Sequence, residues 1–466
     1  MFLFVLGRQP EIGFAELAAV FGAENVVSVS RNVAAVSAIF AKNFRFERLG
    51  SVVKVAEVFA KIPDNSELKL ADFSRKIVEE FASENGKLTL GFSSETRDIS
   101  ARNLDEISAR IREETRGSFR EVLRERGEEK LNSASVFHNK LTGESSRKAE
   151  IIFAKTTRKI AEIFRENSEQ NPEEKTSAGF DFLLAKTLFV QNITSYTFRD
   201  RGRPKRDAKV GMLPPKLAQT IVNFATENRE TEGRILLDAF VGTGVILQEA
   251  ALLGMEVYGT DIELRMIDYT RENLAWVSRK FGREFREIGA PRDFARKLEV
   301  GSATEMKWDF RGAENGENVR ENAEKNFAKT RENFAKNDEK FAKSSENSFA
   351  KTKEKNVIFP DFVAGETYLG RAYATAPSAE NLRENIGNVN KILTEFLRNL
   401  RKQANENTGI CLAVPAWFVR GKTLHLPLLR ELENLGFLRK FSGLIYHRED
   451  QIVGRELLVL KKISRK

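Results

Sequence analysis

The residues best suited to chemistry gather in the stretch 235–261, which holds a tight glycine turn between two acids. Gly242, Thr243 and Gly244 form the turn, Asp238 precedes it and Asp261 follows it. Glycine lets the backbone come close to a ligand, and a helix that begins after such a turn offers free N–H groups to that ligand. A carboxylate at the end of the next strand is placed to accept hydrogen bonds from ribose hydroxyls. The stretch therefore predicts a site for a nucleotide-like cofactor.

The pattern around the turn predicts the elements that position these residues. Ile235–Leu237 is an apolar run of the kind found in buried parallel strands. Val245–Leu253 follows the turn as a predicted helix and ends at Gly254, a suitable C-cap. A second apolar run, Val257–Gly259, leads to Asp261. This order is one half of a doubly wound fold. The alternative is a strand–helix–strand unit whose glycines only permit close packing.

The residues of the turn also narrow the class of cofactor. A dinucleotide fingerprint needs a further glycine, which this turn lacks. The run 238–244, DAFVGTG, instead resembles the D-P-F-C-G-S/T-G motif of S-adenosylmethionine-dependent RNA methyltransferases, with Ala239 and Val241 as departures. The resemblance implies S-adenosylmethionine as the cofactor. It assigns the following cofactor-binding residues: Asp238, Phe240, Gly242, Thr243, Gly244, Asp261, Ile262, Ser302 and Ala303. The family usually has an acid where this chain has Ser302.

A second motif of such enzymes, D/N-P-P-Y/F at the end of a strand, has its counterpart in Glu366-Thr367-Tyr368. Methylation of an exocyclic amine needs two oxygens that accept its hydrogens and an aromatic face that holds the unstacked base. By the resemblance, Glu366 is the catalytic acceptor, Thr367 supplies a carbonyl and Tyr368 the aromatic face. Glutamate is longer than aspartate, both prolines are missing and the aromatic residue comes one position early. Tyr373 is an alternative stacking residue.

Segments outside the two motifs make the resemblance more specific. Residues 199–219, RDRGRPKRDAKVGMLPPKLAQ, look like the linker and first motif of the archaeal and eukaryotic enzymes that methylate guanine at tRNA position ten. Residues 446–456 resemble the C-terminal signature of the same family. Arginine clusters can grip phosphates, so the basic linker is a candidate RNA contact, the alternative being an exposed, solvated connector. Its candidate RNA-binding residues are Arg199, Arg201, Arg203, Lys205 and Arg206.

The domain organisation is expected to be α/β: a Rossmann-like methyltransferase domain with a mostly parallel seven-stranded sheet, preceded by an α+β THUMP-type RNA-binding region. Residues 2–17 and 48–59 resemble the start of tRNA guanine N2-methyltransferases that carry a THUMP domain. The expected domains are a ferredoxin-like domain at 1–65, a THUMP-type domain at 66–195, a basic linker at 196–210 and the methyltransferase domain at 211–466. Within the last, residues 311–355 are rich in Glu, Asn, Lys and Arg and predict a mobile insertion. Coiled-coil pairing or an RNA contact is the alternative for that insertion.

Three further helices are expected from local pattern. They cover residues 48–58, which follow a turn, the basic amphipathic stretch 107–126, and residues 428–435, which end before a glycine.

Composition agrees with a globular protein that binds a polyanion. The chain has 466 residues, with 76 Lys and Arg against 67 Asp and Glu, for a net charge of +9, which favours a nucleic-acid partner. One cysteine, Cys411, rules out an intrachain disulfide, and the three histidines show no metal-ligand spacing. No apolar stretch approaches the length of a signal peptide or a membrane span, so no membrane contact and a cytoplasmic location are expected.

These observations predict methyl transfer from S-adenosylmethionine to the N2 amine of a guanosine in tRNA. A second possibility within the class is an rRNA guanine N2-methyltransferase, because the amine chemistry is the same. A third is an RNA-binding protein whose methyltransferase domain is inactive, which Ser302 and the proline-free motif favour. A DNA amine methyltransferase fits the basic linker less well. The sequence leaves open whether an accessory subunit is needed.

Overall fold

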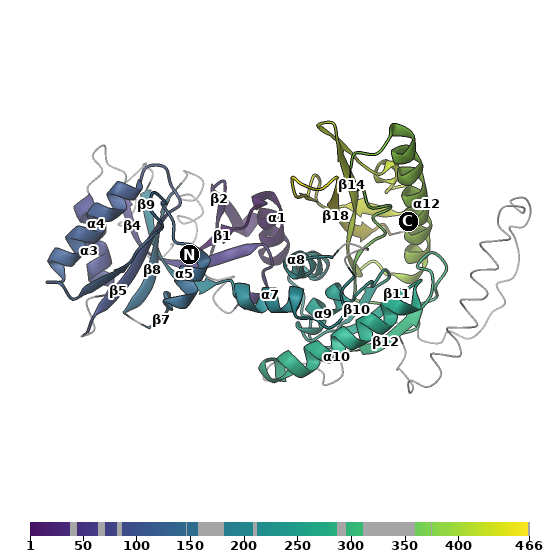
Figure 1. Ribbon diagram of the computed structural model, residues 1–466, viewed down its shortest axis with the longest axis horizontal. Helices are drawn as coiled ribbons and strands as arrows, with labels where there is room; N and C mark the ends of the chain where they lie inside the picture. Colours follow the sequence, from purple (N-terminus) through teal and green to yellow (C-terminus); the bar gives the residue numbers. More distant parts are fainter. Residues whose placement is uncertain are drawn as a thin grey trace, which may run out of the picture. The chain divides into compact units, whose positions relative to one another are not determined.

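The computed structural model divides into two compact units, Met1–Thr197 and Phe198–Lys466. It describes residues 1–37, 44–63, 70–81, 86–145, 147–156, 181–207, 212–286, 295–310, 359–373 and 375–464. The expected insertion at 311–355 lies outside the described residues, as does the expected boundary near residue 65. Each unit is built on its own nine-stranded sheet (Figure 1).

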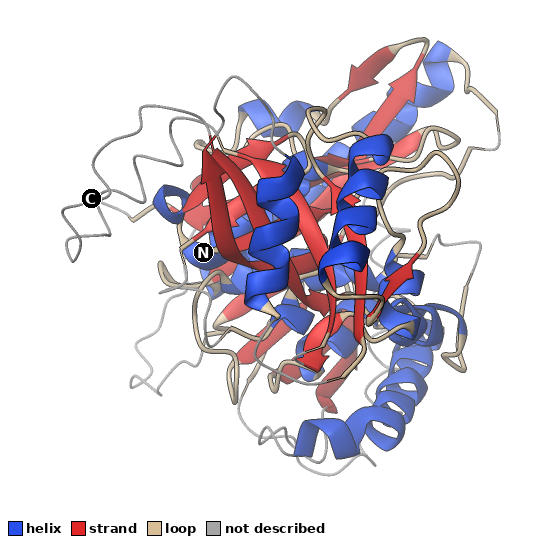
Figure 2. Ribbon diagram, turned by 90° about the vertical axis from the view of Figure 1, so that its left-hand side faces the viewer, coloured by secondary structure: helices blue, strands red, loops and turns tan. Residues whose placement is uncertain are grey.

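The first unit is a mixed sheet partly covered by helices. Its strands are β1 (Phe2–Leu6), β2 (Val26–Ser30), β3 (Val33–Val36), β4 (Val52–Pro63), β5 (Leu88–Ser94), β6 (Phe119–Val122), β7 (Thr142–Ser145), β8 (Lys148–Lys155) and β9 (Asp181–Val190). Its helices are α1 (Pro10–Phe21), α3 (Leu70–Glu80), α4 (Ala101–Glu114) and α5 (Ser133–His138), with short 3-10 turns at Ala23–Asn25 and Phe46–Arg48. The strands run in the order β2-β3-β1-β4-β9-β8-β5-β6, with β7 beside β8. Helices α3 and α4 lie side by side over one face of the sheet (Figure 2).

The second unit is a doubly wound sheet. Its strands are β10 (Ile235–Asp238), β11 (Glu256–Asp261), β12 (Ala295–Val300), β13 (Phe362–Glu366), β14 (Gly409–Val419), β15 (Lys422–Leu424), β16 (Phe437–Arg439), β17 (Ile445–Tyr446) and β18 (Val453–Lys462). Its helices are α8 (Pro215–Thr226), α9 (Val245–Ala251), α10 (Leu264–Arg286) and α12 (Ala379–Gln403), with the 3-10 turn η4 (Pro427–Arg430). The helix α7 (Ile193–Arg201) joins the two units.

The strand order confirms the predicted Rossmann-like sheet, although the sheet has nine strands where seven were expected, because β15 and β17 add to the seven-strand path. The strands run β12-β11-β10-β13-β14-β18-β16, with β15 beside β14 and β17 beside β18. The five from β12 to β14 pair in parallel, whereas β18 is antiparallel to β14 and to β16. This is a Rossmann-like, mostly parallel sheet in which the chain order reverses between β10 and β13. Ligands of such sheets bind at the carboxyl ends of the strands next to that reversal.

Helices cover both faces of this sheet and complete its core. The buried side of α12 contributes Val389, Leu393 and Phe396, which pack in one cluster with Val363 of β13 and Leu412 of β14. Helix α8 packs against β13 and β14, α9 packs against β10 and β11, and α10 packs against β11 and β12. The alternation of side chains along each strand sends neighbouring apolar residues to opposite faces, so every central strand is buried on both sides.

Two expected helices are wrong, and a third is present with other bounds. Residues 52–63 form β4, which lies between β1 and β9, because valines at 52, 53, 55 and 58 favour a sheet once partners are available on both sides. The helix expected at 107–126 is α4, which begins at a Ser100–Asn103 capping box and ends at Glu114. Arg116 and Gly117 have positive φ, which breaks the helix before β6. Residues 428–435 form only the turn η4 and bends.

No helix among the described residues combines the length and the apolar character needed to cross a membrane.

Candidate active site

Three carboxylates meet at the carboxyl ends of neighbouring strands. Asp238 ends β10, Asp261 ends β11 and Glu366 ends β13, and β10 lies between the other two strands. The three therefore surround the point where the strand order reverses. The Asp238 side chain is buried, and its burial raises the pKa of that carboxyl well above its ordinary value. The negative charges of Asp261 and Glu366 raise it further, as expected for acids that share one site.

The glycine turn between β10 and α9 has the geometry of a ligand-binding loop. Gly242 and Gly244 both have positive φ, and Gly244 is the N-cap of α9 in the left-handed conformation. A Cβ at Gly244 would lie 2.7 Å from the Thr270 side chain, so only glycine fits there. Thr270 Oγ1 donates to the carbonyl of Gly242 at 2.9 Å, and Asn273 Nδ2 donates to the carbonyl of Thr243 at 2.8 Å. Two side chains of α10 thus fix the turn.

Asp261 connects β11 to the same turn. Its Oδ2 accepts from the Gly242 N–H at 2.9 Å and its Oδ1 accepts from the Glu263 N–H at 3.0 Å. Burial raises the pKa of Asp261, and these N–H donors oppose the rise. A carboxylate oxygen accepts more than one hydrogen bond, so both oxygens also have capacity for ribose hydroxyls.

Residues suited to an adenine ring flank Asp261. Ile262 is 47% exposed and Leu264 is 39% exposed, although both are large apolar side chains directly after a buried strand. Across the sheet edge, Ser302 and Ala303 follow β12, and the Gly301 N–H donates to the Asp261 carbonyl at 2.9 Å. The Ser302 hydroxyl is hydrogen-bonded to Thr304 Oγ1 at 2.7 Å, and the Ala303 side chain is buried. This side of the site presents apolar surface and one hydroxyl, without the acid usual in the resembling family.

Phe240 precedes the turn and packs against α12. Its N–H donates to Asp238 Oδ1 at 3.1 Å, and its ring lies edge-on to Phe396 of α12, with the ring centres 4.9 Å apart. A Cβ at Gly365 would lie 2.6 Å from Asp238 Oδ1, so the glycine before Glu366 is what allows β13 to lie so close to Asp238. This close approach brings the two motifs of the sequence together.

The second motif presents an acid, a buried threonine and an exposed ring. Glu366 Oε1 accepts a hydrogen bond from Arg455 Nε, from β18. Burial raises the pKa of Glu366, and the Arg455 guanidinium opposes the rise. Thr367 is buried, its N–H and its hydroxyl both donate to the Ala413 carbonyl, and Tyr368 is 45% exposed. Tyr373 packs at the edge of the apolar core and donates to the Asn381 carbonyl at 3.4 Å.

The basic stretch expected to be an exposed linker is partly buried instead. Arg199 lies on α7, is buried, and pairs with buried Glu249 of α9 at 2.8 Å. Arg203 is also buried. The backbone of Lys205 exchanges two hydrogen bonds with the Asn273 side chain, which itself holds the glycine turn. The stretch therefore braces the site. Of the five basic residues named from the sequence, Arg201 and Arg206 are exposed.

This division predicts different effects for neighbouring arginines. Arg199→Ala leaves Glu249 buried without its partner, and the free energy of unfolding should fall by about 3 kcal/mol or more. Arg201→Ala combined with Arg206→Ala should leave thermal unfolding unchanged and reduce the salt dependence of RNA binding by about two charges. Thermal melts and binding titrations at several salt concentrations separate the two. An unchanged salt slope for the double variant would remove both residues from the RNA contact.

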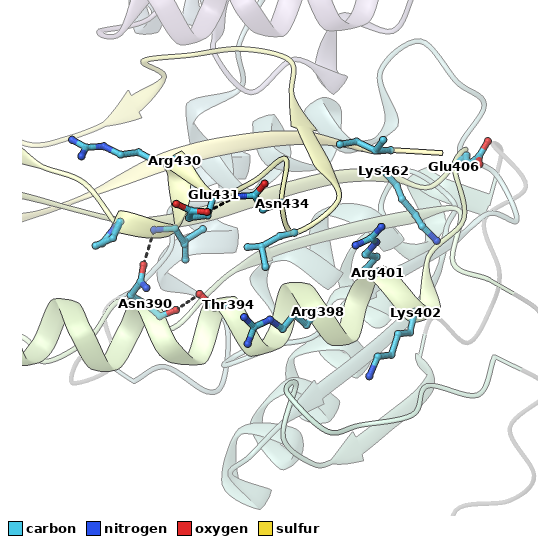
Figure 3. Close-up of a pocket in the computed structure, with 14 residues that line it drawn as sticks. Asn390, Thr394, Arg398, Arg401, Lys402, Glu406, Arg430, Glu431, Asn434 and Lys462 are labelled. Atoms are coloured by element: carbon cyan, nitrogen blue, oxygen red, sulfur yellow. Dashed lines mark hydrogen bonds between the residues drawn. The ribbon is translucent and has the colours of Figure 1, made fainter. Parts of the chain in front are cut away.

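The described surface also contains a large open cavity remote from these acids. It has a volume of about 1180 Å³ and lies between the C-terminal half of α12, the η4 region and the end of β18 (Figure 3). Arg398, Arg401, Glu431 and Lys462 are among its lining residues, and it includes no residue of the two motifs. Lys462 lies at the end of β18 next to the amino ends of β13 and β14, which is the edge opposite Glu366. The site is therefore assigned from its chemistry and strand position, not from cavity size.

Comparison with known proteins agrees with this geometry. Residues 203–415 match the family model UPF0020, described as an RMKL-like methyltransferase domain. Residues 203–415 are thus similar to a methyltransferase domain of this description. The domain includes the glycine turn, all three carboxylates and the Glu366-Thr367-Tyr368 motif.

The chain is also similar to curated proteins named as tRNA-modifying enzymes. It is 39% identical over 97 residues to a tRNA (guanine(10)-N2)-dimethyltransferase of Methanocaldococcus jannaschii, a match that covers 20% of this chain and 27% of that protein. An enzyme of the same name from Methanothermobacter thermautotrophicus is 48% identical over 94 residues, covering 20% of this chain and 26% of that protein. The chain thus spans about a quarter of the length of the curated relatives it matches. These matches confirm the resemblance found from the motifs.

A solved structure of similar extent is TrmN from Thermus thermophilus. It covers 99% of both chains with 13% identity and a TM-score of 0.43.

Three residues of the site have no role that the sequence pattern assigns. Arg455 lies in the C-terminal signature without a distinct function there, and Thr270 and Asn273 lie on α10. The positions of Arg455 and Glu366 in the sequence do not indicate that they are in contact. They meet because β14 lies between their strands, and only the sheet order shows this. The sequence offers one sign of the role of Thr270 and Asn273. Both are short polar residues in the segment after Asp261, which could hydrogen-bond to the turn.

Proposed function

We propose that this protein transfers a methyl group from S-adenosylmethionine to the N2 amine of a guanosine in tRNA. The observation that carries the proposal is the position of Glu366, an acid at the carboxyl end of β13 beside the glycine turn and Asp238. The names of the relatives support guanine N2 as the acceptor and tRNA as the substrate.

The residues of the site fit the proposed cofactor. Asp238 is a buried acid with one hydrogen bond from Phe240, and its second oxygen is suited to the cofactor's ammonium group. Asp261 suits the ribose, and the exposed side chain of Ile262 suits an adenine ring. The glycine turn leaves space for the ligand because Gly242 has no side chain where the backbone has positive φ. Thr243, Gly244, Phe240, Ser302 and Ala303 complete the proposed contact surface.

The chain's own residues supply orientation and a proton acceptor. Glu366 accepts one N2 hydrogen and the Thr367 carbonyl is proposed to accept the other, which aims the nitrogen lone pair. Exposed Tyr368 stacks on the base after it leaves the RNA helix. Bound S-adenosylmethionine supplies a methyl group on a cationic sulfur, which keeps the S–C electron pair as N2 forms the new N–C bond. N2 then loses one proton, which the Glu366 carboxylate accepts.

The first unit and the exposed arginines 201 and 206 are proposed to bind the RNA. The first unit has the position of a THUMP-type region, and a cytoplasmic location is proposed for the protein as a whole.

A direct assay tests the proposal. Purified full-length protein is incubated with radiolabelled S-adenosylmethionine and with separate pools of unmodified tRNA and rRNA, and the nucleosides are analysed by mass spectrometry. N2-methylguanosine in tRNA is the expected product. If N2-methylguanosine forms only in the rRNA pool, the substrate is rRNA and the tRNA proposal is overturned.

Two observations favour an inactive domain as the second candidate. The Ser302 hydroxyl is engaged by Thr304 at a position where an acid is usual, and the second motif has no proline. Cofactor binding measured by calorimetry, together with no label in either RNA pool, would support an RNA-binding protein without transferase activity.

A further inference from the structure

Glu366 and Arg455 form a partly buried ion pair that links β13 and β18 across β14. Glu366 is in register with Ala413 of β14, and Arg455 is in register with Pro415 of the same strand from the other side. Arg455 therefore reaches across β14 to the acid. The side chains are 16% and 8% exposed, respectively. A pair at this position is part of the active site and not of the surface.

The pair leaves a defined set of donors and acceptors. Within the described part of the chain, Nε is the only Arg455 nitrogen with a hydrogen-bond partner, and Oε1 is the only Glu366 oxygen with one. The terminal nitrogens of Arg455 remain as donors, and both Glu366 oxygens retain acceptor capacity. The ion pair thus offers one donor group next to two acceptors.

Guanine presents the complementary arrangement on its Watson–Crick edge. O6 is an acceptor, and N1–H and the N2 amine are donors, in that order. Adenine presents an amine donor followed by the N1 acceptor, which would place its N1 lone pair against the Glu366 carboxylate. A flipped base is read through hydrogen bonds to this edge.

We propose that Arg455 is a specificity and positioning residue: it donates to guanine O6 from a terminal nitrogen and orients Glu366 to accept from N1–H and the N2 amine. This inference rests on the proposed function and adds the group that selects guanine. The pair reproduces the hydrogen-bonding pattern that cytosine offers to guanine.

The charged groups around Glu366 make the activity depend on pH. Asp238 on β10 is a second acid whose pKa the charge of Glu366 helps to raise, β14 contributes apolar Ala413 at this register, and Arg455 on β18 is the cation. Burial already raises the pKa of Glu366, and loss of Arg455 would raise it more. Because the ionised form is the acceptor, activity falls as the pH drops through this pKa. Removal of Arg455 should therefore move the acid limb of the rate profile to higher pH.

The test compares guanosine with 6-thioguanosine at the methylated position of an otherwise identical tRNA, once that position is mapped. Sulfur in place of O6 weakens the acceptor and leaves N1–H and the N2 amine unchanged. The wild-type protein should methylate the thio substrate about 10-fold more slowly, as expected for one charge-assisted hydrogen bond. Arg455→Met should remove that difference and shift the acid limb upward, whereas Arg455→Lys should retain a wild-type acid limb.

Arg398→Met in the remote cavity is the matched control and should change neither readout. Equal loss on both substrates by Arg455→Met, with the acid limb unmoved, would overturn the inference and leave Arg455 a structural residue. If Arg455→Met does not fold, the test uses Arg455→Lys instead. The proposal would be contradicted if this variant kept the 10-fold preference for guanosine over 6-thioguanosine and its acid limb moved away from the wild-type pH. Failure of the wild-type protein to form N2-methylguanosine in any RNA would instead overturn the proposed function.

Discussion

Glu366→Gln is expected to lower the rate of methyl transfer by about 100-fold or more while the cofactor still binds. Glutamine has nearly the same shape, and its oxygen can still accept from Arg455. It lacks the negative charge that attracts the N2 hydrogen and it cannot take up the released proton. Initial rates with radiolabelled S-adenosylmethionine measure the first effect, and calorimetry measures cofactor affinity.

This prediction has a control variant and an outcome that would contradict it. Tyr368→Phe keeps the exposed aromatic ring at the neighbouring position and serves as the control, with a rate close to that of the wild-type protein. Full activity of Glu366→Gln would remove Glu366 from its role and shift attention to other acceptors near Asp238.

Asp261→Ala is expected to weaken cofactor binding by about 10- to 100-fold, the effect of losing hydrogen bonds to a charged acceptor. The variant removes the acceptor for ribose hydroxyls and also the group that holds the Gly242 N–H, so the turn loses a fixed point. Because burial raises the pKa of Asp261, wild-type affinity should decline on acidification at a higher pH than for an exposed aspartate. Calorimetric titrations across a pH series measure both effects.

Glu263→Ala is the matched control for this prediction. Glu263 lies two residues beyond Asp261, and its exposed carboxylate pairs with Arg265. Its loss should therefore leave cofactor affinity unchanged. An Asp261→Ala protein with wild-type affinity would place the ribose elsewhere.

The fold of the second unit followed from short-range pattern because its signals are local. An apolar strand, a turn that needs positive φ at Gly242 and Gly244, and a helix that ends before Gly254 are all encoded within about thirty residues. The expected carboxylates at strand ends also needed only one rule, that parallel strands present their carboxyl ends at one edge. The amino-acid sequence is therefore sufficient to identify these acids.

The first unit was predicted less well for a physical reason. Residues 52–63 have mixed propensity, and their valines became a central strand only because β1 and β9 lie on either side. Strand propensity depends on the partners a strand has, whereas helix end signals such as the Ser100 cap are local.

The sequence by itself determined the class of domain, the glycine turn and the three acids of the candidate site. Tertiary structure alone decided which charges those acids meet. Arg455 reaches Glu366 across β14, Arg199 is buried against Glu249, and Asn273 connects the basic stretch to the glycine turn. Each of these contacts joins residues at least 30 positions apart, so its existence depends on strand order and helix packing. Local pattern carries no information about such distances, and burial, which sets the strength of every charge in the site, is a property of the whole fold.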